Sequence, residues 1–208
     1  MRKAFSKEEY TKREKLISDT AMQLLQERKF ANITMRELAK SCNMAIGTLF
    51  NYYPTKELLL RKLLYESYDS YFSAEIERLG QAKLETVDDY TAFNIAGLPA
   101  VFDNHALIAL LSIHHDVFTA AEDTYSLSQL RLAWGEKLIL TGSLIHGQLP
   151  RITQQQAVKY YYFLHALLVG YNNLLEIPGM NCPPLFSIDE KEEIRKAVSC
   201  YCGSFRAE

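Results

Sequence analysis

The sequence is poor in chain breakers and contains no long apolar run. It has six prolines and nine glycines in 208 residues, and almost none fall inside its periodic stretches. The apolar–polar alternation that indicates β-strands is hard to find. No apolar run approaches the roughly 20 residues that span a bilayer. No apolar segment follows the basic start MRKAFSKEEYTKREK, so we expect neither a membrane protein nor a signal peptide.

Motifs for catalysis, metal binding and disulfide frameworks are also missing. The four cysteines lack the spacing of a secreted framework and predict reduced thiols in a cytoplasmic protein: Cys42, Cys182, Cys200 and Cys202. Neighbouring residues on a helix point about 100° apart, so neither His114-His115-Asp116 nor Cys200-x-Cys202 forms a chelating face. There is no Ser-His-Asp constellation and no phosphate-binding glycine loop. We therefore expect no catalytic residue, no metal site and no cofactor, and the protein is predicted not to be an enzyme.

Charge is nearly balanced over the chain but unevenly distributed along it. The net charge of −2 by itself offers no attraction to nucleic acid. Residues 1–65, however, hold 13 Lys/Arg against 7 Asp/Glu, whereas residues 66–208 carry a net charge of −8. This asymmetry indicates a basic interaction module of net charge +6 joined to an acidic body. A merely solvated basic surface is the alternative interpretation.

Apolar residues at steps of three and four predict an all-α protein of about nine helices. The first four are expected at Lys7–Arg28, from the Thr34 cap to just before Asn43, at Ile46–Tyr52, and from the Thr55 cap to Leu79. Thr34 and Glu37 have the spacing of a capping box, and Pro54 ends the third helix. Five further helices are expected at about 87–102, 105–121, 126–146, 153–176 and 187–205.

Residues 34–53, TMRELAKSCNMAIGTLFNYY, have the spacing of a helix-turn-helix. Ala39 is small enough for two helices to cross, and Asn43, four residues later, tolerates a left-handed turn. Leu49 would lock the second helix onto the first. Three further residues are expected on the inner face: Leu38, Cys42 and Phe50.

The outer face of the third helix is predicted to read DNA. Its residues are short, polar or aromatic: Ala45, Gly47, Thr48, Asn51 and Tyr52. Small residues let a helix approach the floor of the major groove, and hydroxyl and amide groups bond base edges or phosphates. Four residues flank this helix where a DNA backbone would pass: Thr34, Arg36, Tyr52 and Lys56.

Residues 13–63 resemble the N-terminal domain of the TetR (tetracycline repressor) family of bacterial transcription regulators. The resemblance rests on Thr34, Leu38-Ala39, Gly47-Thr48-Leu49-Phe50 and Thr55-Lys56-Glu57-Leu58. It implies that Thr34 and Lys56 contact phosphates, that Arg36 reaches a base edge or phosphate, and that Tyr52 contacts phosphate or sugar. Gly47 and Thr48 would lie against the major groove.

Three residues depart from the family pattern. Asn43 stands where glycine is common, Ala45 where serine is frequent, and Phe50 where tyrosine is common. Asn43 can still adopt the left-handed turn. The other two changes remove hydroxyl groups that often touch phosphate, which alters the expected contacts but not the module.

The resemblance further implies a helix-turn-helix domain at 1–54 and a helical ligand-binding and dimerisation domain at 55–208, joined through the long fourth helix. Segment 153–176 has only two charged residues, and 187–205 has one apolar side: Ile188, Ile194, Ala197, Val198, Tyr201 and Phe205. We predict that these two segments form a homodimer interface. Burial in the core of one protomer is the alternative.

Residues of the middle helices are candidates for a ligand pocket, which is usually apolar with a few polar groups. The candidates are His114, Phe118, Tyr125, Trp134 and His146. Ordinary core packing is the alternative for each of them.

The sequence thus predicts a DNA-binding transcription regulator. We expect a repressor that binds a double-stranded palindromic operator as a homodimer, with reading helices roughly 34–36 Å apart. A small apolar or aromatic effector would release it. One alternative is a helical small-molecule binding protein or enzyme whose basic end is incidental. Another is a regulator controlled by a protein partner.

Overall fold

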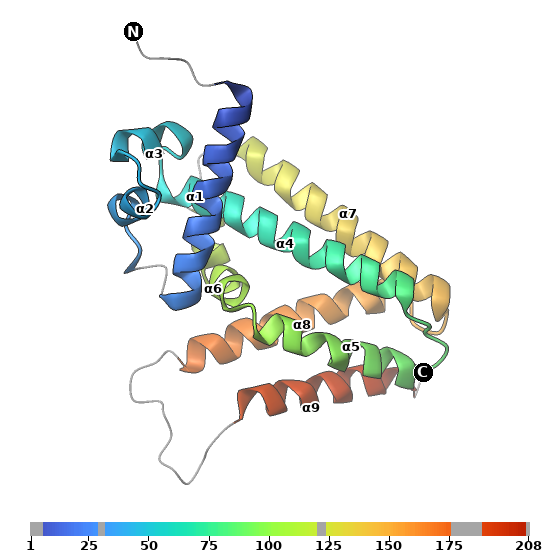
Figure 1. Cartoon of the computed structure of the whole chain (residues 1–208). Helices are drawn as coiled ribbons and strands as arrows, with labels where there is room; N and C mark the ends of the chain where they lie inside the picture. Colours follow the sequence, from blue (N-terminus) through green and yellow to red (C-terminus); the bar gives the residue numbers. More distant parts are fainter. Residues whose placement is uncertain (1–5, 29–31, 120–123, 176–188, 207–208) are drawn as a thin grey trace. The chain divides into compact units, whose positions relative to one another are not determined.

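A computed structural model of the chain describes residues 6–28, 32–119, 124–175 and 189–206 (Figure 1). Within these ranges the chain is all-α, with no strand, as the sequence predicts. Its helices are α1 (Lys7–Glu27), α2 (Met35–Ser41), α3 (Ile46–Tyr52), α4 (Lys56–Gln81), α5 (Val87–Phe102), α6 (His105–Thr119), α7 (Thr124–Gln148), α8 (Gln154–Leu175) and α9 (Glu190–Gly203), followed by a 3₁₀ turn, Ser204–Arg206. The expected helix ends agree with these bounds to within three residues.

The chain divides into two compact units. The first consists of Met1–Glu66 and His105–Glu122, and the second of Ser67–Asn104 and Asp123–Glu208. The division cuts α4 in its middle and assigns α6 to the first unit, where α6 packs on α1. The sequence had placed residues 105–121 with the acidic body.

Local capping fixes the helices of the first unit. Ser6 and Glu9 form a complete capping box at the start of α1. The Thr34 hydroxyl accepts a hydrogen bond from the Glu37 backbone N–H at 3.1 Å, as expected, but the Glu37 carboxylate pairs with Arg28 instead of closing the box. The Glu37 carboxylate thus pairs with the Arg28 guanidinium and does not accept a hydrogen bond from the Thr34 backbone N–H. The Thr55 hydroxyl caps α4 by accepting from the Leu58 N–H at 3.2 Å.

The turn between α2 and α3 has the conformation that the sequence predicts. Asn43 has φ 51°, in the left-handed region. The Met44 N–H donates to the Ala39 carbonyl at 2.9 Å, and the Asn43 N–H donates to the Lys40 carbonyl at 3.0 Å. These two bonds form a Schellman motif, which ends α2 and redirects the chain into α3. Asparagine therefore fills the position where the family commonly has glycine.

The second unit is built from two closely packed helix pairs. In the first pair, α7 lies so close to α8 that a Cβ on Gly142 would stand 2.9 Å from the Gln154 carbonyl oxygen. In the second, α5 and α9 lie side by side (Figure 1). Four residues of α9 and the 3₁₀ turn are buried: Ile194, Val198, Cys202 and Phe205.

Within the described ranges, no single helix is long and apolar enough to span a membrane. Helix α5 and the first part of α6 (His105–Ile113) together have the length and apolar composition of a span, but the two are bent by 88° at the break between them. The described residues contain no group of three or more His, Cys, Asp or Glu side chains that could hold a metal ion.

Candidate functional site

The eight residues predicted to contact DNA all lie at the surface of the first unit. Five are exposed: Thr34, Arg36, Ala45, Gly47 and Asn51. Thr48, Tyr52 and Lys56 are half-buried. The structure therefore leaves every one of these residues at least partly accessible, although the hydroxyl group of Tyr52 is itself buried.

One side of α3 anchors the helix and another is exposed to solvent. Leu49 is 0% exposed and lies in the core, as the helix-turn-helix spacing predicts. Phe50 was expected on the inner face beside Leu38 and Cys42, and this prediction is wrong: Phe50 is 43% exposed, while the other two are buried. The reason is the helical step of about 100° between adjacent residues, which carries Phe50 away from the side that Leu49 occupies.

Gly47 has no packing role that the structure reveals. A Cβ added at this position would meet no atom within 4 Å. Glycine inside a helix costs roughly 0.5–1 kcal/mol relative to alanine. Packing in the described structure therefore does not explain a glycine on the exposed side of α3.

We expect Gly47→Ala to raise the free energy of unfolding by about 0.5–1 kcal/mol, because the helix gains a better helix former in open space. The same substitution should weaken DNA binding, because the methyl group holds α3 away from the groove. Thermal unfolding and fluorescence anisotropy with a labelled duplex measure the two effects. Unchanged DNA affinity would contradict the groove-facing assignment of Gly47.

Thr34 and Lys56, which lie 22 positions apart in the sequence, border one small apolar hollow. Met35, Leu38 and Leu59 are among its other lining residues. Burial lowers the pKa of Lys56 from its usual value, and the nearby Glu57 carboxylate partly opposes this shift. An anion beside Lys56 would favour its charged form.

Tyr52 is covered by a residue that sequence reasoning missed. Its ring stacks on that of Tyr10 in α1, with 4.4 Å between ring centroids and 27° between planes. The Tyr52 hydroxyl is buried, and burial raises its pKa. The stack ties the end of α3 to the start of α1, and no spacing pattern in the sequence signals a pairing of residues this far apart.

Only two of the five predicted pocket residues have described side chains. His114, Phe118 and Tyr125 lie outside this part of the structure. Trp134 contacts the Tyr68 ring, with 4.3 Å between centroids. His146 is exposed near the end of α7, where its Nδ1 atom lies 2.9 Å from the Ile152 carbonyl oxygen. It lies twelve positions after Trp134, about 18 Å along the helix.

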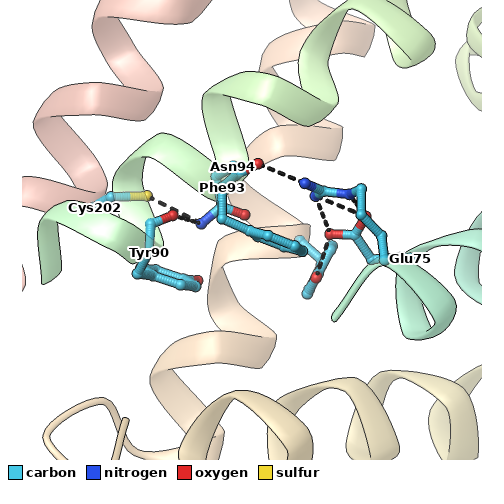
Figure 2. A network of polar contacts seen from close by, with 7 residues as sticks. Glu75, Tyr90, Phe93, Asn94 and Cys202 are labelled. Atoms are coloured by element: carbon cyan, nitrogen blue, oxygen red, sulfur yellow. Dashed lines mark hydrogen bonds and ion pairs between the residues drawn. The ribbon is translucent and has the colours of Figure 1, made fainter. Parts of the chain in front are cut away.

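The interior of the second unit holds a buried ion pair that the sequence did not indicate. The Arg78 guanidinium donates to the Glu75 carboxylate from Nε at 3.0 Å and from Nη2 at 2.9 Å, and to the Phe93 carbonyl at 2.7 Å. The Tyr161 hydroxyl donates to Glu75 at 3.0 Å. Figure 2 shows Glu75 and Phe93 within this network. The contacts join α4, α5 and α8.

A second set of contacts continues the network toward α9. The Asn94 amide donates to the Tyr90 carbonyl at 2.9 Å and to the Cys202 sulfur at 3.6 Å (Figure 2). Burial raises the pKa of the Cys202 thiol to about 12. Cys202 is thus an unreactive, protonated packing residue, since the thiolate is the reactive form.

The two segments predicted to form a dimer interface differ in what they expose. The apolar side of α9 is used inside the protomer, where Ile194 and Val198 are buried. Ile188 lies outside the described residues. In α8, by contrast, a stripe at helical steps is exposed: Gln155, Lys159, Tyr162, Ala166 and Gly170.

Known proteins match this chain at two levels. Residues 17–63 match the family model of bacterial regulatory proteins, tetR family. The uncharacterized HTH-type transcriptional regulator YuxN of Bacillus subtilis (strain 168) is 36% identical over 61 residues, which are 29% of this chain and 21% of that protein. The match therefore spans about a fifth of that relative's length.

Solved structures match over nearly the whole chain. A protein of Mesorhizobium loti MAFF303099 assigned to the TetR-family regulators has a TM-score of 0.58 at 14% identity, covering 95% of this chain and 96% of its own. The TetR-family repressor AlkX of Dietzia sp. strain DQ12-45-1b has a TM-score of 0.52 at 14% identity, covering 93% and 95%.

The multidrug binding protein EbrR, solved with imidazole, has a TM-score of 0.54 at 15% identity, covering 91% of this chain and 94% of its own. At these identities the likeness shows the fold. Residues 17–63 thus match the model of the tetR family of bacterial regulatory proteins, and the chain has the fold of solved TetR-family regulators.

Proposed function

We propose that this protein is a cytoplasmic, non-enzymatic transcription regulator that represses genes by binding a palindromic operator as a homodimer. The observation that carries the proposal is that all eight predicted contact residues, seven in one helix-turn-helix and Lys56 just after it, are at least partly accessible. The net charge of +6 over residues 1–65 supports it, because phosphate neutralisation supplies much of the affinity for DNA.

Binding of a labelled random-sequence duplex at low salt tests the proposal. The wild-type chain should retain the duplex, and Thr48→Ala should weaken binding by about two- to tenfold, the effect of one lost contact. Tyr52→Ala should also weaken binding, because it removes the ring that ties the end of α3 to Tyr10 of α1. Thr11→Ala, which changes an exposed threonine of α1 outside the motif, is the matched control. Failure of the wild type to retain any duplex would overturn the proposal.

Sedimentation of the same variants separates reading from packing. Both should keep the mass of the wild-type oligomer. Loss of that mass in Thr48→Ala or Tyr52→Ala would mean that these residues hold the structure together and do not read DNA.

The homodimer is proposed to form through about 153–176 and 187–205. Support comes from α8, where Tyr162 is 64% exposed and the small residues Ala166 and Gly170 follow at steps of four. Two copies of this stripe packed across a two-fold axis would cover one another. Selection of binding sites from random DNA tests this, because a dimer selects palindromes whose half-sites lie about one helical turn apart.

A small apolar or aromatic effector is proposed to bind the second unit. Tyr68, Trp134 and His165 support this: the Tyr68 ring contacts Trp134, and its hydroxyl lies 3.0 Å from His165 Nδ1. The fold relatives AlkX, implicated in n-alkane degradation, and EbrR, a multidrug binding protein, also favour such ligands. Because Tyr68 belongs to α4, a ligand that displaces it would move the helix that begins at the helix-turn-helix.

The effector releases DNA only if it prefers the conformation that does not bind DNA over the conformation that does. The free energy of coupling between two such sites is typically about 1–3 kcal/mol. Trp134 is the only tryptophan of the chain, so its fluorescence reports ligand binding directly. Titration with a panel of alkanes and aromatic compounds, followed by DNA release, tests this part of the proposal.

A further inference from the structure

Two large apolar side chains are exposed on α3. Ile46 is 37% exposed and Phe50 is 43% exposed. They are four residues apart in one helix, which places one above the other on the same face. A single exposed apolar side chain is ordinary on a protein surface. Two neighbours on the helix proposed to enter DNA form a contact surface of defined chemistry.

The other residues of α3 limit the kinds of DNA contact that this helix can make. The sequence of α3, IGTLFNY, contains no charged side chain. The helix therefore has no arginine or lysine to pair with guanine, the commonest specific contact in the major groove. Positive charge comes from the rest of the module, which has a net charge of +6 over residues 1–65 and so matches the negative DNA backbone.

The major groove offers one apolar group at base edges, the C5 methyl of thymine, which apolar side chains contact. We propose that Ile46 and Phe50 read thymine methyl groups and are specificity-determining residues of this protein. The inference rests on the proposed DNA-binding function. Asn51, which is also exposed on α3, carries an amide group of the kind that pairs with the N6 and N7 atoms of adenine, the partner of thymine.

Deoxyuridine substitution in a selected duplex tests the inference. The wild-type chain first selects its binding sites from a random pool, and each thymine of the selected duplex is then replaced by deoxyuridine, which removes only the methyl group. Loss of one buried methyl contact should weaken binding about fourfold, and about fifteenfold when both half-sites of the palindrome are changed.

Variants of the pair assign the effect to particular residues. Each variant, Phe50→Ala and Ile46→Ala, should lose the dependence on the methyl group at one of the sensitive thymine positions. At that position it should bind the thymine duplex and the uridine duplex with nearly equal affinity. Leu16→Ala, which removes a side chain 46% exposed on α1, is the matched control and should keep the full dependence on the methyl group. Thermal unfolding checks that each variant is folded.

The outcomes are distinct. If the wild type selects a site but no uridine substitution changes affinity more than twofold, thymine reading is wrong and DNA binding stands. If the dependence persists in both alanine variants, other residues read the methyl groups and the assignment is wrong. If the wild type selects no sequence, the proposed function itself fails.

Discussion

Arg78→Ala should lower the free energy of unfolding by about 3 kcal/mol. Glu75 is 6% exposed, and Arg78 supplies the positive charge that compensates its carboxylate. Removing one partner of a buried ion pair typically costs about 3–5 kcal/mol, because a buried charge is left uncompensated. We place the effect at about the lower end, since one third of the Arg78 side chain is exposed and partly screened by water.

The guanidinium also packs over the Phe93 ring, 3.4 Å from the ring centroid, and a Cβ on Gly97 would come within 2.8 Å of its Nη2 atom. Loss of the side chain therefore opens a gap between α4 and α5 as well as breaking the pair. Urea unfolding followed by circular dichroism measures the change.

Two further variants test the cause. Lys196→Ala breaks an exposed pair with Glu193 and should leave the unfolding midpoint unchanged. Glu75→Leu combined with Arg78→Met should recover most of the lost stability, because apolar residues of similar volume can replace a buried pair. If the double variant is as unstable as Arg78→Ala, packing and not uncompensated charge explains the loss.

DNA binding by the wild type should fall about a thousandfold between about 50 and 200 mM salt. Arg36, Lys40 and Lys56 are accessible cations around the helix-turn-helix. If each neutralises one phosphate, the proposed dimer contacts about six, and release of their counterions gives this dependence. The measurement is the affinity at a series of salt concentrations. A plot of the logarithm of the affinity against the logarithm of the salt concentration gives the slope.

Lys56→Ala should reduce the magnitude of that slope by about two for the dimer, or about 0.9 for each lost phosphate contact. Lys83→Ala is the control, because Lys83 lies in the second unit and pairs with Glu85. An unchanged slope in Lys56→Ala would show that Lys56 does not contact phosphate, whatever its effect on affinity.

Local features of this chain follow from its sequence because their partners lie a few residues apart. Thr34 and Thr55 cap their helices through backbone groups three residues away. The turn after α2 requires a residue in the left-handed conformation, and Asn43 adopts it without a distant partner. For the same reason the apolar periodicity predicted the helices and their ends closely.

Features that depend on partners far apart in the sequence could not be predicted from it. Glu75 and Tyr161 are 86 residues apart, and nothing local distinguishes this glutamate from one in solvent. From the sequence, the apolar side of α9 was predicted to lie at a dimer interface, with burial in one protomer as the alternative. In the structure Ile194 and Val198 on this side are buried within the protomer, where α9 packs on α5. Phe50 was assigned to the wrong face because apolar character alone predicts the core.

An all-α chain with a basic helix-turn-helix module and an acidic body can be predicted from the sequence, because periodicity, caps and charge are properties of short segments. Three features required the folded structure: which apolar residues are exposed on α3, which helices share a unit, and which carboxylate is buried with an arginine. Each of these depends on free energies of burial and pairing between residues that the chain brings together only when it folds.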